Sequence, residues 1–315
     1  MSRLLDIKNL SVSFVSGEET VRAVTDVSFD LCEDEVLTLV GETGCGKSII
    51  AHAISGLLPP EALVSGEIRY KEKDLQSIPE EERVLLRGCE IGIVLQNPSR
   101  ALNPLYTIGH QIRETILRHT EKSKEESNRM VAGALRRMGF SDPGIEMKRY
   151  PFESSGGMNQ RFVIASSTIL SPDLLIADEP TTGLDRSRIQ DVITEFERIM
   201  EEEEMAIILI THDLAVARRL ADRIGIMYAG EVVEMGDANR IFEEPYHPYT
   251  KGLFGSLPEN GCVPIPGVSP PMSRIVSGCR FHPRCGKRTA VCERDHPQLG
   301  MIDDRYVRCH LCHSQ

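Results

Sequence analysis

The sequence predicts an α/β protein built on a mostly parallel sheet, with a helical insertion and a small irregular C-terminal segment. Short apolar runs alternate with helical stretches over the first 235 residues, a pattern typical of strands buried on both faces of a parallel sheet. Between Gln96 and about Tyr150 the pattern becomes mostly helical. From about Glu243 the chain loses its periodicity and becomes rich in proline and cysteine. These three textures define the predicted architecture.

The sequence also predicts individual helices and strands. A helical stretch, SIIAHAISGLL, begins at Ser48, and the helical subdomain is expected at about 97–165. The acidic run Glu201–Glu204 is most simply a solvated helix end. The candidate strands are Leu4–Ile7, Glu35–Val40, Gly92–Leu95, Leu174–Ala177, Ala206–Ile210 and Arg223–Met227.

The length and the charge limit the class of protein. The 315 residues suffice for two domains, and the change of texture predicts a division into 1–240 and 241–315. The formal net charge is −11, with 39 acidic and 26 basic side chains in the first 235 residues. Such an acidic body has no broad electrostatic footprint for nucleic acid, so we expect no nucleic-acid partner. No apolar run approaches the ~20 residues needed to cross a bilayer, and the N-terminus lacks the apolar region of a signal peptide. We therefore expect a cytoplasmic protein that a partner can bring to a membrane.

Residues 41–48, GETGCGKS, fit the phosphate-binding pattern G-x-x-x-x-G-K-[ST]. The match is supported by its context, because it follows the apolar run VLTLV and opens a helical stretch. Glycines let backbone N–H groups curl around phosphate oxygens, and the helix N-terminus adds a favourable dipole. We expect Lys47 to reach the β- and γ-phosphates and the Ser48 hydroxyl to bind Mg²⁺. The predicted nucleotide-binding residues are Gly41, Glu42, Thr43, Gly44, Cys45, Gly46, Lys47 and Ser48.

A second half of a phosphate site is predicted at the end of another strand. The run LLIADE places Asp178 and Glu179 directly after four apolar residues. Asp178 would be the carboxylate nearest Mg²⁺, and Glu179 the general base for the attacking water. Alone, this pair could be a charged strand end, and its pairing with the glycine-rich loop favours the catalytic interpretation. His212 follows the run AIILIT, a position that predicts a side chain directed at the γ-phosphate.

These motifs occur in the order typical of ATP-binding-cassette (ABC) ATPases. After residues 41–48 come Gln96, SSGGMNQR at 154–161, LLIADEP, TGLD at 182–185 and THD at 211–213. The chain therefore resembles an ABC ATPase over essentially its whole length. Within that superfamily it looks like a nucleotide-binding subunit of the oligopeptide, dipeptide and nickel importers. This narrower resemblance is carried by QNPSRALNPLYTIGHQI, PYHPYTKGLFGSLP, and IPGVSPP followed by SGCRFHPRC.

The resemblance implies a fold and several residue roles. The implied fold is a P-loop ABC ATPase core, a mostly parallel sheet plus an antiparallel subdomain, with the helical insertion. Phe14 resembles the aromatic residue that stacks on adenine. Gln96 resembles the residue that links Mg²⁺ and the attacking water to the insertion, and His212 resembles the γ-phosphate switch. Asp185 resembles a dimer-contact aspartate.

The glycine pair in 154–161 resembles the signature loop of the family, Ser155, Gly156 and Gly157, which caps the γ-phosphate of ATP held by the opposite subunit. Ser-Gly-Gly before a helical run also exposes backbone N–H groups at the start of a helix. Such groups form an anion-binding site, for which this subunit itself supplies no ligand. Two chains placed head to tail would each complete the site of the other. ATP would then favour the closed dimer, and hydrolysis would remove that preference.

One departure from the family concerns this loop. Ser154 stands where family members usually carry Leu, and Asn159 stands where Arg is frequent. Because that Leu packs the signature helix, we expect the loop to be held less firmly. We hypothesise that in a heterodimer the weaker composite site pairs this signature with the partner's P-loop, while the site built on Lys47 and Glu179 keeps turning over.

Six of the nine cysteines lie after residue 236. In a reducing cytosol such clustering favours a metal or cluster over disulfides. The spacing C-x5-C-x6-C-x16-C matches neither a ferredoxin nor a two-knuckle zinc pattern and identifies no metal alone. The resemblance implies a [4Fe–4S] cluster, because some peptide importer subunits carry one in this segment; zinc is the alternative, with the nearby histidines as further ligands. The implied cluster ligands are Cys279, Cys285, Cys292 and Cys309.

The sequence thus predicts an ATPase subunit that binds Mg²⁺ and ATP at the cytoplasmic face of the cell membrane. The expected partners are a paralogous ATPase subunit, or a second copy, two integral-membrane permease subunits and, indirectly, an extracytoplasmic solute-binding protein. Peptides, nickel or a related solute would be imported. The insertion, from Asn97 to about Tyr150, is the expected docking surface for a permease. The alternatives are a soluble cassette ATPase in a non-transport complex, such as one for phosphonate degradation, and a nucleic-acid-associated cassette ATPase.

Overall fold

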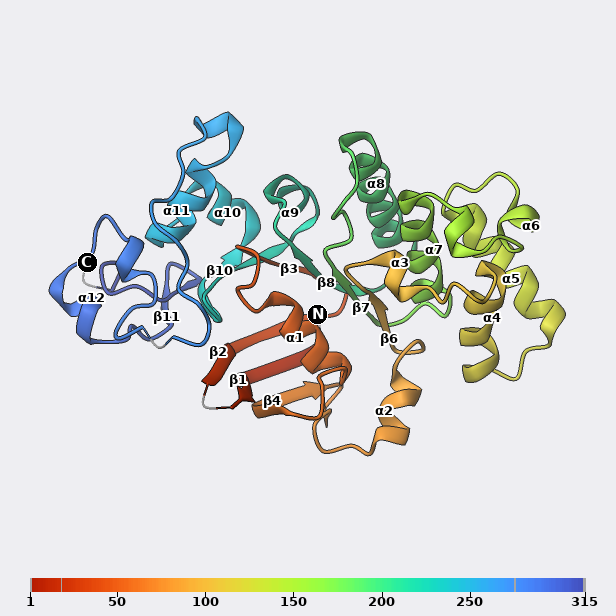
Figure 1. The fold of residues 1–315 in the computed structure, drawn as a ribbon, viewed down its shortest axis with the longest axis horizontal. Helices are drawn as coiled ribbons and strands as arrows, with labels where there is room; N and C mark the ends of the chain where they lie inside the picture. Colours follow the sequence, from red (N-terminus) through yellow and green to blue (C-terminus); the bar gives the residue numbers. More distant parts are fainter. Residues whose placement is uncertain (1, 18, 275, 314–315) are drawn as a thin grey trace. The chain divides into compact units, whose positions relative to one another are not determined.

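The computed structural model describes residues 2–17, 19–274 and 276–313 and divides into two compact units. Residues 77–210 make up the first, here called the helical unit (Figure 1). The second, here called the phosphate-loop unit, combines residues 3–76 with residues from 211 onward. The C-terminal segment therefore belongs to the same compact unit as residues 41–48, and the expected separate cysteine-rich domain is not seen. Among the described residues, no helix has the length and apolar character to span a membrane.

The helical unit contains three parallel strands, as the apolar runs predict. They are β6 (Ile91–Val94), β7 (Leu174–Asp178) and β8 (Ala206–Thr211). Strand β7 pairs with both of its neighbours, and every residue of β7 and β8 is buried. Burial on both faces explains why these strands could be found as continuous apolar runs.

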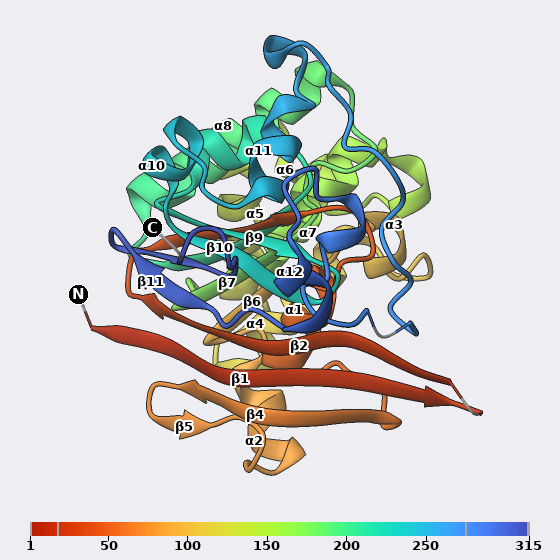
Figure 2. The ribbon, with the colours of Figure 1, turned by 90° about the vertical axis from the view of Figure 1, so that its left-hand side faces the viewer.

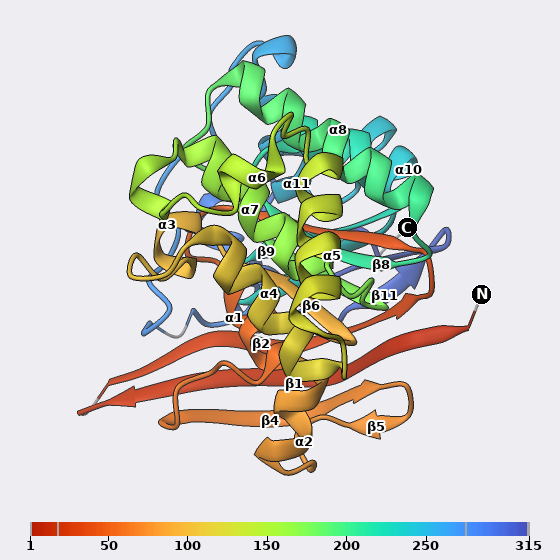
Figure 3. The ribbon, with the colours of Figure 1, turned by 90° about the vertical axis from the view of Figure 1, so that its right-hand side faces the viewer.

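Helices make up most of the rest of this unit, and the predicted helical insertion is confirmed. Apolar faces of α4, α5 and α7 contact one another (Figure 3). The start of α5 is fixed by a capping box between Ser123 and Glu126. Glu201 and Glu202 form the exposed end of α8, as expected. The helices are α2 (Glu80–Leu86), α3 (Pro98–Ala101), α4 (Ile108–His119), α5 (Lys124–Arg137), α6 (Pro143–Glu146), the 3₁₀ turn Pro151–Glu153, α7 (Gly156–Thr168) and α8 (Arg186–Glu202).

An antiparallel sheet opens the phosphate-loop unit, in the order β2-β1-β4-β5 (Figure 2). This is the antiparallel subdomain that the family resemblance implies. The predicted strand Leu4–Ile7 covers only the first part of β1, because the rest of β1 mixes polar and apolar residues and its pairing with β2 shifts register repeatedly. The strands are β1 (Arg3–Ser16), β2 (Glu19–Cys32), β4 (Ala62–Tyr70) and β5 (Lys73–Asp74).

The other strands of this unit lie side by side in the order β11-β12-β10-β9-β3. Strand β3 runs parallel to β9, and β10 pairs with β9 in the antiparallel sense. The predicted strands Glu35–Val40 and Arg223–Met227 are therefore confirmed to within a residue, whereas β10 was missed. The strands are β3 (Val36–Gly41), β9 (Arg223–Tyr228), β10 (Glu231–Asp237), β11 (Gly300–Ile302) and β12 (Arg305–Val307). The helices are α1 (Lys47–Ser55), α9 (Leu214–Leu220) and α10 (Ala238–Glu243).

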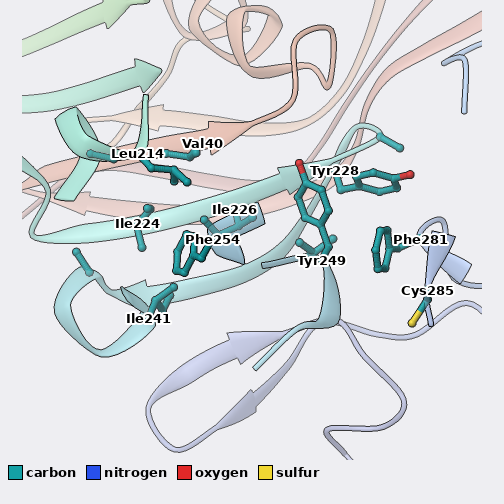
Figure 4. Packing of buried hydrophobic residues seen from close by; sticks show 14 residues of the cluster. Val40, Leu214, Ile224, Ile226, Tyr228, Ile241, Tyr249, Phe254, Phe281 and Cys285 are labelled. Atoms are coloured by element: carbon teal, nitrogen blue, oxygen red, sulfur yellow. The ribbon is translucent and has the colours of Figure 1, made fainter. Parts of the chain in front are cut away.

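The C-terminal segment packs its aromatic residues on β9 (Figure 4). The Tyr228 ring lies 4.7 Å from the ring of Tyr249 and 5.2 Å from that of Phe281, centroid to centroid. Phe254 and Cys285 belong to the same buried cluster. The C-terminal segment therefore buries apolar side chains in a cluster shared with β9. Its helical pieces are α11 (Pro248–Gly255), α12 (Ala290–Arg294) and the 3₁₀ turns Pro258–Asn260 and His282–Arg284.

Candidate functional site

Residues 41–48, here called the phosphate loop, connect buried β3 to the N-terminus of α1. Two of its glycines are required by close packing. A Cβ atom on Gly41 would lie 2.3 Å from the carbonyl oxygen of Met227, and one on Gly46 would lie 2.2 Å from that of Ala23. Gly46 also caps α1 with φ 106°, in the left-handed region that favours glycine. This strand–glycine loop–helix arrangement suits phosphate binding.

Lys47 is buried, and its ammonium group lies on the backbone of the loop. Its Nζ donates to the carbonyl oxygens of Gly41, at 2.7 Å, and Glu42, at 3.2 Å. Cys45 is also buried, with its sulfur 3.8 Å from the same Nζ. Burial raises the pKa of the Cys45 thiol, while Lys47 opposes the rise. The ammonium group of Lys47 thus lies against the backbone of the phosphate loop.

Phe14 lies on β1 in the same unit, where it pairs with Val21 of β2 and Ala62 of β4. Its side chain is half-buried, so part of the ring reaches solvent. The exposed part of the ring is compatible with stacking on a flat ligand.

The acidic pair lies in the helical unit, at the end of β7. Asp178 and Glu179 are 3% and 6% exposed. Glu179 has φ 50°, a backbone conformation that few non-glycine residues adopt and that clusters at functional sites. Its N–H donates to Ile210 of β8 at 2.8 Å, and Thr182 donates its hydroxyl to Oε2 at 3.1 Å. The Glu179 carboxylate is therefore held in one orientation by its neighbours.

Gln96 follows β6, the strand that pairs with β7 in parallel. Carboxyl ends of neighbouring parallel strands meet at one sheet edge, so the structure brings Gln96 to the edge that holds Asp178 and Glu179. Gln96 is exposed there. His212 follows β8 and is also exposed.

The predicted signature residues begin α7. Ser155 caps the helix, accepting from the N–H of Met158 at 3.3 Å. Arg188 donates to the Ser155 hydroxyl at 3.3 Å and lies against Gly157. Asp185 caps α8 and pairs with Arg188 at 3.2 Å. The sequence analysis missed Arg188, although its position three residues after Asp185 could have indicated it.

These residues surround a hollow of about 260 Å³ in the helical unit. Helix-start N–H groups and the Arg188 guanidinium give it two kinds of anion-binding donor. Its lining residues are Ser155, Gly157, Met158, Arg161, Arg188 and Val192, together with Asp191.

The two sequence departures have different consequences. Asn159 is buried and donates to the carbonyl oxygen of Pro151 at 3.0 Å, which ties the turn before the signature to α7. The hydroxyl of Ser154 is buried and finds no hydrogen-bond partner among the described residues. Asn159 therefore supports the loop through its amide N–H group, although its Oδ1, like the Ser154 hydroxyl, is buried without a hydrogen-bond partner among the described residues.

The four cysteines named as cluster ligands lie in the phosphate-loop unit. Burial, with smaller contributions from the thiols of Cys309, Cys292 and Cys285, raises the pKa of Cys279 to about 12. A hydrogen bond with Cys312 lowers the pKa of Cys309 to about 6. Across residues 2–17, 19–274 and 276–313, no group of three or more His, Cys, Asp and Glu side chains is placed to hold a metal ion. The structure therefore gives the predicted iron–sulfur or zinc site no support.

The predicted site residues therefore fall into two groups, one in each compact unit. Phe14 and the phosphate loop belong to one compact unit, and Gln96, Asp178, Glu179 and the signature residues belong to the other. The convergence of Lys47 with the acidic pair remains a prediction.

Comparison with protein families gives two matches along the chain. Residues 24–182 match the family model described as ABC transporter. Residues 233–292 match the model described as oligopeptide/dipeptide transporter, C-terminal region. Together the matches include the phosphate loop, the signature residues, the acidic pair and much of the C-terminal segment.

Similar proteins span nearly the whole chain. The dipeptide transport ATP-binding protein DppD of Bacillus subtilis (strain 168) is 44% identical, over 99% of this chain and 95% of that protein. Its namesake from Escherichia coli (strain K12) is 40% identical, over 98% and 96%. Among solved structures, the ATP-binding cassette MJ0796, in a dimeric post-hydrolysis state with ADP and Pi, matches with a TM-score of 0.68 and 26% identity. That match covers 75% of this chain and 99% of the other.

Proposed function

This chain belongs to the ABC transporter family of ATPases, and on that premise we propose that it is the ATP-hydrolysing subunit of a peptide importer. The observation that carries the proposal is its end-to-end similarity to dipeptide transport ATP-binding proteins, C-terminal segment included. Because the similar proteins from Bacillus subtilis and Escherichia coli are named dipeptide transport ATP-binding proteins, we propose a peptide rather than nickel as the solute.

In the proposed site, the phosphate loop binds the triphosphate and Lys47 neutralises its β- and γ-phosphates. Phe14 stacks on the adenine. Mg²⁺, when bound, would neutralise charge on the phosphates, and Ser48 and Asp178 are the residues that would hold it, with Gln96 beside it. This assignment is supported by the glycine-dependent packing of the loop.

The chemical step assigned to this chain is activation of a water molecule. Glu179 accepts a proton from the water, as general bases do when held within hydrogen-bond reach. Its strained backbone and its contact with Thr182 support this role, because they fix the carboxylate. His212 is assigned to the γ-phosphate.

The signature hollow is assigned to the ATP of a second subunit, either a paralogue or another copy. Its support is that it offers anion-binding groups at the start of α7 together with Arg188. Asp185 would contact the dimer partner. In this proposal ATP joins two subunits, and its hydrolysis separates them.

The remaining partners follow from the importer assignment. Two permease subunits would carry the peptide across the membrane and dock on the insertion, residues 97–150, with the chain peripheral at the cytoplasmic face. A binding protein would deliver the peptide outside. The non-transport alternative is not favoured, because the chain matches the transporter C-terminal region.

A finer proposal is that Cys279, Cys285, Cys292 and Cys309 hold a [4Fe–4S] cluster, with zinc as the alternative. It rests on the family resemblance alone, because the described residues contain no group of side chains placed to hold a metal ion. A cluster predicts brown protein with a band near 400 nm after anaerobic purification, and zinc predicts colourless protein with stoichiometric metal. Protein free of both overturns the proposal.

The test of the main function is peptide uptake by the assembled transporter. In liposomes holding the complex, ATP should drive uptake of a labelled dipeptide, and Lys47→Ala should abolish both uptake and ATP binding. Lys8→Ala, which changes an exposed lysine on β1, is the control and should leave both intact. Co-purification with other enzymes instead of permeases would favour the non-transport alternative. ATP binding unaffected by Lys47→Ala would refute the site.

A further inference from the structure

The carboxylate of Glu42, the second residue of the phosphate loop, is bound by the C-terminal segment. Arg284 donates from Nη1 to both of its oxygens, at 2.9 and 3.1 Å. The hydroxyl of Ser269 also donates to Oε2. The Arg284 side chain is only 7% exposed, against 30% for Glu42. This ion pair is therefore shielded from solvent more than a surface pair would be.

Arg284 is itself held in place by the C-terminal segment. Its Nε donates to the carbonyl oxygen of Pro266 at 3.1 Å, and its Nη1 donates to the Ser269 hydroxyl at 3.0 Å. The guanidinium carbon lies 5.7 Å from the centroid of the Tyr228 ring. These contacts orient the planar guanidinium toward Glu42. It therefore loses little further freedom when it binds the carboxylate.

The backbone of Glu42 is held from the same segment. Its N–H donates to the phenol oxygen of Tyr249 at 3.2 Å. Tyr249 is fully buried and packs against Tyr228 and Phe281. Burial, aided by the negative charge of Glu42, raises the pKa of Tyr249, so the phenol stays neutral. On the other side of the residue, the Glu42 carbonyl accepts from Lys47.

We propose that Arg284 and Tyr249 are positioning residues of the nucleotide site. Tyr249 holds the start of the phosphate loop in its binding conformation through the Glu42 N–H, and Arg284 neutralises a carboxylate that would otherwise repel a triphosphate. The inference rests on the proposed function, because it takes the phosphate loop as the place where ATP binds. It gives the C-terminal segment a direct part in nucleotide affinity, although that segment supplies no group to the phosphates.

The test is a double-mutant cycle on the assembled transporter. The measured quantity is the Kd of a slowly hydrolysed ATP analogue with Mg²⁺. Arg284→Gln should raise this Kd about tenfold, because Glu42 keeps its charge without a partner. Glu42→Gln keeps the loop backbone and removes the carboxylate, so its Kd should fall, because Arg284 then adds an uncompensated positive charge beside the triphosphate. In Glu42→Gln/Arg284→Gln the affinity should return, since the repelling charge is gone.

The rescue separates the proposal from a purely structural role. If Arg284 only folds the C-terminal segment through Pro266, Glu42→Gln cannot repair its loss, and that outcome overturns the proposal. Arg240→Gln removes an exposed ion pair with Asp304 in the same unit and should leave the Kd unchanged. An unchanged Kd in Arg284→Gln also overturns the proposal.

If Arg284→Gln fails to assemble, Tyr249→Phe provides a second test of the proposal. The ring keeps its packing but loses the acceptor for the Glu42 N–H, so the Kd should rise about threefold to tenfold. An unchanged Kd contradicts the proposal. Lys47→Ala separates a failure of the proposed function from a failure of this inference. If Lys47→Ala binds ATP normally, the proposed ATP site is wrong. If Lys47→Ala loses ATP while Arg284→Gln and Tyr249→Phe keep it, only the role given to Arg284 and Tyr249 is wrong.

Discussion

At the residue scale, polar groups next to the signature loop differ in how well they are satisfied. Ser155 uses its hydroxyl as a helix cap, and Asn159 bonds Pro151. Ser154, directly before Ser155, buries a hydroxyl that has no partner within the described part of the chain. An unsatisfied buried hydroxyl costs about 1–3 kcal/mol. The sequence departure at Ser154 therefore weakens the local structure.

Two neighbouring serines provide a matched prediction. Ser154→Ala should raise the free energy of unfolding by about 1 kcal/mol, because it removes a buried unsatisfied group. Ser155→Ala should lower it by about 1 kcal/mol, because α7 loses its cap. Urea unfolding of both variants beside the unchanged protein measures the difference. Changes of the same sign in the two variants would contradict this account.

His247 gives a prediction for pH dependence. Burial lowers the pKa of His247 from its ordinary 6.5 to about 3, and its Nδ1 accepts the N–H of Tyr249 at the start of α11. Below pH 6.5 the unfolded chain binds a proton that the folded protein does not, so stability falls with pH down to about 3, by up to about 1.4 kcal/mol per pH unit. His247→Asn keeps a capping acceptor without this proton.

The comparison is made between pH 7 and pH 5. The free energy of unfolding should drop more in the unchanged protein than in His247→Asn over this interval. Equal drops would mean that His247 is not the titrating group.

At the element scale, the sequence predicted the elements whose burial is uniform. Strands β3, β7 and β8 are buried throughout and were found as apolar runs. Strand β10 is also buried but contains Glu231 and Glu234, so its pattern is interrupted. The Glu42–Arg284 pair joins positions 242 residues apart, and no local pattern encodes such a contact. Local periodicity therefore predicted strands and motifs but not what holds them together.

Glu234 shows why β10 carries a buried charge. Its two carboxylate oxygens accept the N–H groups of Tyr246 and His247, at 2.8 and 2.9 Å, and Arg305 lies 3.7 Å away. Glu234→Ala should lower the stability by about 3–5 kcal/mol, because Arg305 is left buried without its partner. Glu243→Ala, at the exposed end of α10, is the control.

Limited proteolysis measures this effect where it should arise. Cleavage within 257–270, the exposed segment after α11, should speed up in Glu234→Ala and not in the control. Equal cleavage would mean that Glu234 does not anchor the C-terminal segment.

At the scale of the whole molecule, the proposed catalytic groups are divided between two compact units. The phosphate loop lies in one, and Glu179 and the signature hollow lie in the other. Each of these groups could be predicted from its sequence motif. The contacts of the C-terminal segment with the phosphate loop could not.

The last prediction concerns the two ATP sites of a heterodimer. We propose that in a heterodimer the paralogue's signature completes the site on Lys47 and Glu179. The paralogue's own site would then be completed by the loop after Ser154, whose hydroxyl is buried without a partner among the described residues. Glu179→Gln should therefore lower ATPase of the assembled complex about 100-fold or more, because the general base is lost. The equivalent substitution in the paralogue should cost much less. Glu201→Gln, at the exposed end of α8, is the control.

Ser154→Leu tests the cause of this asymmetry, because it fills the buried position without a polar group. It should raise turnover at the paralogue's site, measured in a complex that carries Glu179→Gln so that the other site is silent. If Glu179→Gln leaves the ATPase of the complex unchanged, the assignment of the active site is wrong. If Ser154→Leu leaves the paralogue's site as slow as before, the asymmetry has another origin than the buried hydroxyl.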